Sequence, residues 1–182
     1  MISNHYEIVI IGAGCIGSSI AFELSRRGYQ SIAVVDRGQN SQSATAQSGG
    51  MLRVFHENPD HIELALNTLN KINQYQDLGV LSEKNIANGN LYFFDKRRYS
   101  DYQTNLQKME IKNYPFEILT PANGRKRFPQ YHWTDSQWAI YEPLASHLSP
   151  LQFSQDLIIA SQKLGLIHYS DFHVERICHF NK

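Results

Sequence analysis

Three glycines near the amino terminus predict a sharp turn between a strand and a helix. Gly12, Gly14 and Gly17 follow the apolar run Glu7–Ile11, and Asp36 lies nineteen residues after Gly17. This spacing is that of the G-x-G-x-x-G dinucleotide-binding fingerprint, in which an acidic residue follows the glycines by about 20 residues. The pattern therefore predicts a strand–helix–strand unit of a doubly wound α/β fold, with a pyrophosphate at the helix N-terminus.

Each residue of this fingerprint has its own physical role. Gly12 allows the turn out of the strand, Gly14 leaves room for the pyrophosphate, and Gly17 allows the helix to pack closely on the strand. Asp36 can accept hydrogen bonds from both ribose hydroxyls and would repel a 2′-phosphate. The expected ligand is therefore an ADP moiety without that phosphate, as in FAD or NAD, and a purely structural glycine turn is the alternative interpretation.

The flanking residues favour nucleotide binding. Glu7–Ile11 is typical of a strand that is buried on both faces. Ile16, Ile20 and Leu24 predict the apolar face of the helix, and Gly28 predicts its end. The short β-branched run Ser31–Val35 then completes a unit of about thirty residues, which is the length that the fingerprint requires.

The composition is that of a globular protein. A chain of 182 residues with 42% hydrophobic content can form one or two domains. Its seventeen basic and seventeen acidic side chains cancel, so no overall field attracts nucleic acid or an anionic membrane. No segment has membrane-spanning length, and the glycine-interrupted N-terminal run is expected to be a core strand and not a signal peptide.

The cysteines and histidines exclude some other classes of site. Two cysteines, Cys15 and Cys178, do not form a disulfide framework, and the cytoplasm is therefore the expected compartment. The eight histidines are scattered without the spacing that would place metal ligands on one helical face. No metal site is predicted.

The rest of the chain alternates between this fold and a smaller inserted region. Residues 37–50 form a loop of small and polar residues, and Asn58-Pro59 predicts the start of a helix. Residues 1–88 are therefore assigned to the first part of a dinucleotide-binding domain, and 89–145 to an α+β insertion. The insertion contains predicted strands at 91–94, 116–119 and 138–141, and predicted helices at 99–109 and after Thr120-Pro121.

The chain is predicted to return to the dinucleotide-binding domain over residues 146–182. Ser149-Pro150 predicts the start of a helix that Gly165 ends, and Leu166–Tyr169 follows as a strand. A right-handed crossover would place this third strand beside the second. His173–Ile177 is predicted to be the next strand.

Several motifs together resemble the D-amino-acid oxidase superfamily of FAD-dependent oxidoreductases, near glycine oxidase and monomeric sarcosine oxidase. They are the glycine fingerprint with Asp36, the run Ser48–Arg53, and the approach to the later helix through Glu142-Pro143 and Leu148-Ser149-Pro150. The resemblance covers nearly the whole chain. It implies a Rossmann-like FAD-binding half with an inserted portion of a substrate domain.

The resemblance also implies positions for the cofactor. Residues of the glycine turn would contact the FAD pyrophosphate, residues after the second strand would hold the adenosine ribose, and the small-residue loop would lie beside the flavin. Val174 matches a position that contacts adenine through backbone atoms. The implied cofactor-binding residues are Gly12, Ala13, Gly14, Cys15, Ile16, Gly17, Asp36, Arg37, Ser43, Ala44, Thr45, Ser48, Gly49, Met51 and Val174.

The implied chemistry is the oxidation of a C–N bond of an amino acid or secondary amine by hydride transfer to the flavin. Arg53 matches an arginine that binds the substrate carboxylate in sarcosine-oxidase-like enzymes, and a surface or interdomain ion pair is the alternative role. Relatives of the dimethylglycine dehydrogenase type attach FAD to a histidine in the loop. The matching residue here is Gln47, so no such bond is expected.

Members of this superfamily are much longer than this chain. Without the later strands of the order 3-2-1-4-5-6, Glu7–Ile11 would be an apolar edge strand, which predicts aggregation or a second chain that completes the fold. Three hypotheses follow: the N-terminal part of a flavin-dependent amine or amino-acid oxidoreductase, an NAD-binding dehydrogenase or nucleotide-binding module, and a catalytically inactive remnant.

Overall fold

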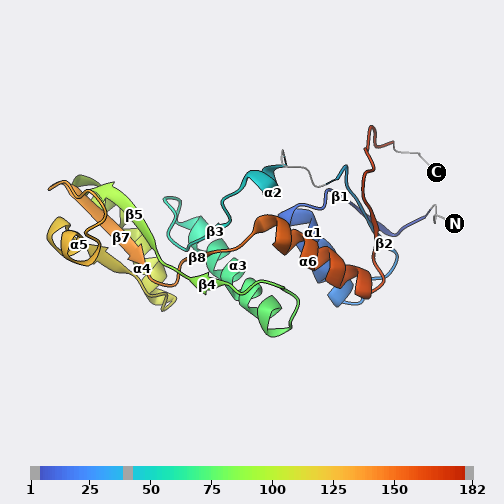
Figure 1. The fold of residues 1–182 in the computed structure, drawn as a ribbon, viewed down its shortest axis with the longest axis horizontal. Coiled ribbons are helices and arrows are strands. Elements are labelled where there is room, and N and C mark those ends of the chain that lie inside the picture. The colour runs from blue at the N-terminus through green and yellow to red at the C-terminus, as the bar shows by residue number, and fades with distance from the viewer. Residues whose placement is uncertain (1–4, 39–42, 179–182) are drawn as a thin grey trace. The chain divides into compact units, whose positions relative to one another are not determined.

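The computed structural model describes residues 5–38 and 43–178, which form two compact units (Figure 1). The first unit combines Met1–Gly50, Tyr75–Lys84 and Leu148–Lys182, and the second combines Met51–Gln74 and Asn85–His147. The C-terminal region thus clusters with the N-terminal part of the chain. Residues 51–74, however, cluster with the middle of the chain, whereas the predicted boundary keeps them within residues 1–88.

The first unit is a parallel sheet with two helices that lie side by side. Its strands are β1 (Ile8–Ile11), β2 (Ile32–Val35) and β9 (Ile167–Tyr169), in the order β1-β2-β9. The helices α1 (Cys15–Arg26) and α6 (Pro150–Lys163) make the connections and contact each other (Figure 1). The predicted Rossmann-like half is confirmed, including the third strand beside the second.

One face of β1 is exposed, so the prediction of a strand buried on both faces is wrong. Ile8 and Ile10 pack against the core, but Val9 and Ile11 are 53% and 54% exposed. Among the described residues β1 pairs with β2 alone and forms an edge of the sheet. The predicted apolar edge strand is therefore present. No element of the described residues covers the face of β1 that carries Val9 and Ile11.

The buried face of α1 also differs from the predicted one. Ile16 and Ile20 are 79% and 47% exposed, whereas the buried residues are Ser18, Ala21, Phe22 and Ser25. Leu24 does pack against the core, as predicted. Because α1 packs against α6 as well as the sheet, the small side chains of Ser18, Ala21 and Ser25 on its buried face let the backbones approach.

The second unit contains a three-stranded antiparallel sheet. Its order is β5 (Asn90–Asp95), β7 (Gln137–Glu142) and β6 (Glu117–Leu119), which confirms the three predicted strands. A second small sheet joins β3 (Met51–Leu52), β8 (Ser146–His147) and β4 (Ile86–Ala87). Strands of two residues have no detectable sequence period, so this second sheet is not predicted.

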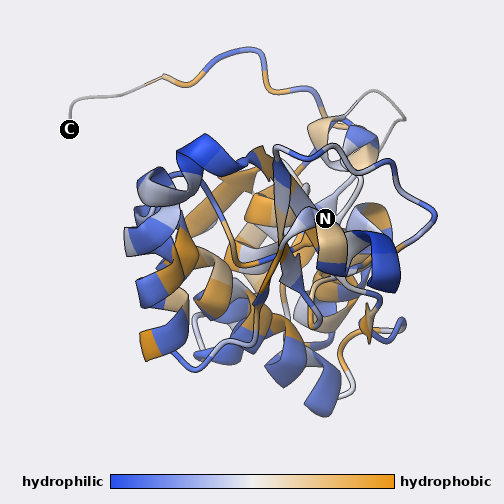
Figure 2. Ribbon diagram, turned by 90° about the vertical axis from the view of Figure 1, so that its left-hand side faces the viewer, coloured by the Kyte–Doolittle hydropathy of each residue, from blue (hydrophilic) through white to orange (hydrophobic). Residues whose placement is uncertain are grey.

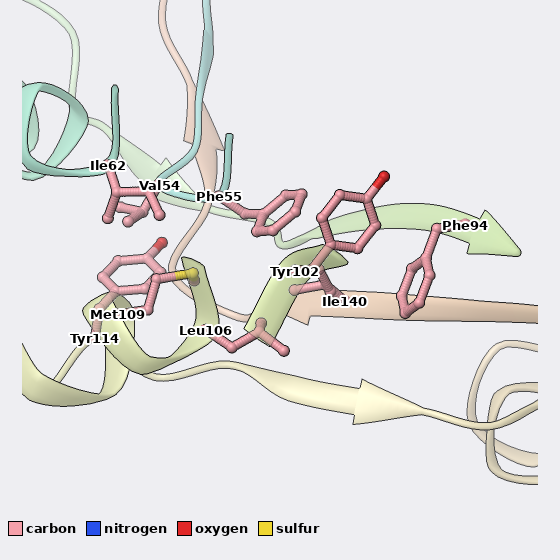
Figure 3. Close-up of a cluster of buried hydrophobic side chains, with 9 residues drawn as sticks. All are labelled: Val54, Phe55, Ile62, Phe94, Tyr102, Leu106, Met109, Tyr114 and Ile140. Atoms are coloured by element: carbon pink, nitrogen blue, oxygen red, sulfur yellow. The ribbon is translucent and has the colours of Figure 1, made fainter. Parts of the chain in front are cut away.

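The core of the second unit joins its helices to the larger sheet. Figure 3 shows the buried side chains of this core: Val54, Phe55, Ile62, Phe94, Tyr102, Leu106, Met109, Tyr114 and Ile140. Leu66 and Leu69 of α3 (Asp60–Asp77) pack against the same cluster. This packing explains why the first part of α3 belongs to the second unit.

The remaining helices lie where the sequence predicted them, but the type of helix differs in one case. The single helix predicted over 99–109 is a 3₁₀ helix, η1 (Lys96–Tyr102), followed by α4 (Gln103–Ile111). Thr120 caps α5 (Pro121–Arg127) as predicted. Hydrophilic and hydrophobic residues alternate along the helices (Figure 2), which is the pattern of helices buried on one side.

Two segments of the first unit are not as predicted. His173–Ile177 is not a strand, since it follows β9 as irregular backbone without a ladder partner among the described residues. The small-residue loop contains a short helix, α2 (Ala44–Gln47), which Ser43 caps through a hydrogen bond from the Ala46 N–H. No helix of the described residues is long and apolar enough to cross a membrane.

Candidate functional site

The glycine turn connects β1 to α1 through a sharply bent and closely packed backbone. Gly12 has a φ of +101° and donates its N–H to the Val35 carbonyl oxygen at 2.8 Å. Gly14 is the N-cap residue of α1 and lacks a capping side chain. A Cβ atom on Gly17 would lie 1.8 Å from the Gly12 carbonyl oxygen. Only glycine at this position permits such close contact between helix and turn.

Asp36 links the end of β2 to this turn. Its Oδ2 accepts a hydrogen bond from the Ala13 N–H at 2.7 Å, and its Oδ1 accepts one from the Gly38 N–H at 2.8 Å. The Asp36 backbone is fixed as well, because its N–H donates to the Tyr169 carbonyl oxygen at 2.9 Å. A carboxylate offers about four lone-pair positions, so both oxygens can still accept further hydrogen bonds.

The short helix α2 contacts the start of α1. Thr45 Oγ1 accepts a hydrogen bond from the Cys15 N–H at 3.2 Å, and a Cβ atom on Gly14 would lie 2.7 Å from the same oxygen. The absence of a side chain at Gly14 therefore makes room for Thr45. Cys15 Sγ lies 3.6 Å from the Pro150 carbonyl oxygen and accepts a hydrogen bond from Ser154 Oγ at 3.5 Å, which makes it a packing residue between α1 and α6.

The end of the small-residue loop contacts the residues that precede α6. Gly50 has a φ of +63°, and its carbonyl oxygen accepts a hydrogen bond from the Leu148 N–H at 3.1 Å. A Cβ atom on Gly50 would lie 2.0 Å from the Leu148 carbonyl oxygen. Two of the motifs that carried the family resemblance, Ser48–Arg53 and Leu148-Ser149-Pro150, therefore meet in the first unit at Gly50.

A cavity of about 340 Å³ opens beside Asp36. It lies at the carboxyl ends of β2 and β9, which is where open α/β sheets bind ligands. The lining residues are Asp36, Gly38, Gln155, Ile158, Ile159, Gln162, His168, Ser170 and Asp171. Within the described part of the chain the buried Nε2 atom of His168 has no hydrogen-bond partner.

The structure brings together most of the predicted residues of the first unit. Gly12, Ala13, Gly14, Cys15 and Gly17 surround one turn, which Asp36 and Thr45 contact. The other predicted residues of this unit lie around the same turn and loop. Ile16, Arg37 and Gly49 are exposed, and Ser43 and Ala44 lie at the start of α2. Ser48 Oγ accepts a hydrogen bond from the Gly50 N–H at 3.2 Å. Val174 follows β9 and does not line the cavity beside Asp36.

Met51 and Arg53 belong to the second unit. Met51 is exposed in β3, and Arg53 is half-buried with its guanidinium carbon 5.8 Å from the Tyr92 ring centroid. Arg53 Nη1 donates a hydrogen bond to the Phe55 carbonyl oxygen at 3.0 Å. Both residues line a cavity of about 290 Å³, together with His56 and His61, which the sequence analysis did not single out.

Glu142 is a further residue whose role was not predicted. Its side chain is completely buried, and its Oε2 accepts hydrogen bonds from the N–H groups of Val54 and Phe55 at 2.7 and 2.9 Å. The carboxylate thereby fixes the backbone directly after Arg53. The only sequence signal would be an acidic residue at the end of the apolar strand β7.

Comparison with known proteins identifies related sequences and folds. The family model "DAO: FAD dependent oxidoreductase" matches residues 7–181. Mitochondrial dimethylglycine dehydrogenase of Rattus norvegicus is 22% identical over 171 residues, covering 88% of this chain and 19% of the relative.

Two solved structures have the same fold along most of the chain. L-proline dehydrogenase from P. horikoshii matches with a TM-score of 0.81 and 18% identity, covering 93% of this chain and 45% of that one. Glycine oxidase from Bacillus cereus matches with a TM-score of 0.73 and 21% identity, covering 97% and 49%. The chain thus spans about a fifth of the curated relative's length and about half of each solved chain.

Proposed function

Because this chain belongs to the DAO family of FAD-dependent oxidoreductases, we propose that it is the FAD-binding part of an enzyme that oxidises a C–N bond. The proposed substrate is an amino acid or a secondary amine. The family and the α/β fold that the sequence predicted are confirmed by the family match and the solved structures.

The contact between the Asp36 carboxylate and the Ala13 N–H carries this proposal. It holds the acidic group at the end of β2 against the turn where α1 begins, so a ribose and a pyrophosphate can be bound by adjacent atoms. In this proposal Asp36 accepts hydrogen bonds from the ribose hydroxyls, and the cavity of about 340 Å³ beside it accommodates the adenosine end.

The residues around the turn suit a pyrophosphate. The N-terminus of α1 offers backbone N–H groups and the positive end of the helix dipole. Thr45 Oγ1 accepts the Cys15 N–H, so its own hydroxyl hydrogen can be donated to a phosphate oxygen. The missing side chain of Gly12, where a Cβ atom would meet no heavy atom within 4 Å, leaves the turn open to a ligand.

When bound, FAD would supply the two-electron oxidation, and the protein would orient the substrate. Arg53 is proposed to bind the substrate carboxylate, since its guanidinium suits bidentate contact with two oxygens. The open edge of β1 is the proposed place where further strands pair, either from a second chain or from a longer form of this one.

FAD titration of the purified chain tests the proposal. We expect the visible absorption bands of FAD to shift and its fluorescence to change, because the isoalloxazine ring leaves water on binding. NAD at the same concentration is expected to compete poorly. Binding of NAD without binding of FAD would instead support a nucleotide-binding module, and binding of neither would support an inactive remnant.

Asp36→Ala is expected to weaken FAD binding by about tenfold, since one or more hydrogen bonds to a charged acceptor are lost. Asp36→Asn is expected to be nearly as weak, because both carboxylate oxygens face N–H donors and one arm of an amide is itself a donor. Fluorescence titration measures both. The control is Asp77→Ala, which removes the same charge from an exposed position, and unchanged FAD affinity in Asp36→Ala would contradict the site.

A further inference from the structure

Arg53 carries its positive charge without an acidic partner in the described part of the chain. None of the ion pairs between residues of the ranges 5–38 and 43–178 involves Arg53. Its Nη1 donates a hydrogen bond to the Phe55 carbonyl oxygen at 3.0 Å, and its guanidinium carbon lies 5.8 Å from the Tyr92 ring centroid. That distance is within the range of a cation–π contact. Two neutral contacts therefore hold the guanidinium and leave its charge uncancelled.

The Tyr92 ring is itself packed between other aromatic rings. Tyr92 lies in β5, and its ring centroid is 4.8 Å from that of Phe55 and 6.1 Å from that of Tyr102. Phe55 and Tyr102 belong to the buried core of the second unit (Figure 3), where their own ring centroids are 5.3 Å apart. The Tyr92 ring therefore cannot turn away from Arg53 without disturbing this core.

Glu57 binds the other end of the Tyr92 side chain. The Tyr92 hydroxyl donates a hydrogen bond to Glu57 Oε1, and the Tyr102 hydroxyl donates to the same oxygen at 3.2 Å. Arg98 Nη1 lies 3.5 Å from this oxygen, so Arg98 is the cation that pairs with Glu57. The bond from Tyr92 is the main cause that lowers the pKa of the Glu57 carboxyl, while burial and the same bond raise the pKa of the Tyr92 phenol. A protonated phenol therefore donates to an ionised carboxylate, which is the stronger kind of hydrogen bond.

The backbone that joins Arg53 to Glu57 is held by side chains of other elements. Glu142 of β7 accepts from the two N–H groups that follow Arg53. Nδ2 of the buried Asn105 of α4 donates to the carbonyl oxygens of His56 and Glu57, at 2.6 and 3.0 Å. The segment between the two charged side chains is therefore fixed to the core of the second unit.

From these contacts we propose that Tyr92 is a positioning residue for Arg53. Its ring face holds the guanidinium at the wall of the cavity of about 290 Å³, and Glu57 fixes the ring through the hydroxyl. A carboxylate in the place of the ring would hold Arg53 as well, but it would compete with an anionic ligand for the same charge. This inference rests on the proposed function for the role of Arg53 as an anion-binding group, whereas its evidence comes from contacts within the second unit.

NMR of the full chain tests this role directly, through the heteronuclear NOE of the Arg53 Nε–H group. This NOE is high for a rigid group and falls when the group moves on the nanosecond timescale or faster. Arg53→Lys assigns the resonance, and the exposed Arg176 gives a reference value in the same spectrum. We expect a high NOE for Arg53 in the unaltered chain. In Tyr92→Leu it is expected to fall to the value of Arg176, because the cation–π contact is lost.

Further variants separate the ring from its hydroxyl. Tyr92→Phe keeps the ring and loses the bond to Glu57, so an NOE between those of the unaltered chain and Tyr92→Leu is expected. Glu57→Ala is expected to give the same intermediate value, and the double variant is expected to be no lower, since both changes remove one and the same bond. Tyr131→Leu is the matched control, because its ring contacts Phe93 in the same unit at 5.9 Å. It is expected to leave the Arg53 NOE unchanged.

Titration with propanoate, a small carboxylate, measures the consequence for anion binding. Tyr92→Leu is expected to weaken propanoate binding by about two- to fivefold, which corresponds to the loss of one cation–π contact. Tyr92→Phe is expected to weaken it by less than about twofold, because the ring remains. A role of Tyr92 in packing alone would leave the propanoate affinity of the folded chain unchanged in both variants.

Two NMR results would overturn the inference: an unchanged Arg53 NOE in Tyr92→Leu, or an equal decrease in Tyr131→Leu. A double variant below both single variants would exclude Glu57 as the group that fixes the ring. Propanoate binding that Tyr92→Leu does not weaken refutes the inference and leaves the proposed function intact. The expected NOE pattern in a chain that does not bind propanoate refutes the carboxylate-binding role of Arg53 in the proposed function, and the positioning by Tyr92 stands.

Discussion

Gly17→Ala is expected to destabilise the first unit by about 3 kcal/mol or more and to abolish FAD binding. The new Cβ atom would lie 1.8 Å from the Gly12 carbonyl oxygen, 3.0 Å from the Gly12 carbonyl carbon and 3.4 Å from Ile10 Cγ2. The two closest contacts are with backbone atoms, so no side-chain rotation can relieve them. Either α1 or the turn must move, and both form the proposed pyrophosphate site.

Urea unfolding followed by circular dichroism measures the loss of stability, and fluorescence titration measures FAD binding. Gly49→Ala is the matched control for the stability measurement alone, because a Cβ atom there meets no heavy atom within 4 Å. This control is expected to change the free energy of unfolding by no more than about 0.5 kcal/mol. A Gly17→Ala variant with the stability and FAD affinity of the unaltered chain would contradict the described turn.

Glu142→Ala is expected to destabilise the second unit by about 2–5 kcal/mol, since each buried N–H left without a partner costs about 1–3 kcal/mol. The two groups concerned are the N–H groups of Val54 and Phe55, both of which donate to Glu142 Oε2. Their residues are fully buried in the core of that unit (Figure 3). Water therefore cannot replace the lost acceptor without disturbing the core.

Glu142→Gln is expected to lose less, about 1–2 kcal/mol, because an amide oxygen can accept from both N–H groups but is a weaker acceptor than a carboxylate. Urea unfolding compares the two variants. Glu110→Ala, which removes an exposed carboxylate from α4, is expected to change stability by no more than about 0.5 kcal/mol. Equal stability of Glu142→Ala and Glu110→Ala would show that the buried carboxylate does not stabilise the backbone at Val54 and Phe55.

The sequence predicted the parts of the fold that depend on local pattern. Gly12, Gly14, Gly17 and Asp36 have a spacing that only one strand–helix–strand arrangement explains, and the structure has that arrangement. The helix starts at Thr120-Pro121 and Ser149-Pro150 were also predicted correctly, because an N-cap hydroxyl followed by proline is a local signal.

The wrong predictions concern the burial or the secondary structure of residues, which depend on packing against elements that are distant in the sequence. Ile16 and Ile20 suggested the buried face of α1 by their spacing, but α6 selects the face with Ser18 and Ala21 instead. Val9 and Ile11 are apolar enough for a covered strand, yet whether a second layer covers them depends on which elements pack there. His173–Ile177 has strand-like composition, but a strand forms only where a neighbour supplies hydrogen bonds.

The sequence by itself determined the strand–helix–strand unit, because the glycine spacing and the acid at the end of the second strand form a local pattern that one arrangement of the chain satisfies. Only the tertiary structure placed Glu142 beneath the backbone after Arg53 and gathered Arg53, His56 and His61 around one cavity. Glu142 lies 88 residues from Val54 in the chain. Contacts over such separations arise from the packing of a whole unit, and no local pattern encodes them.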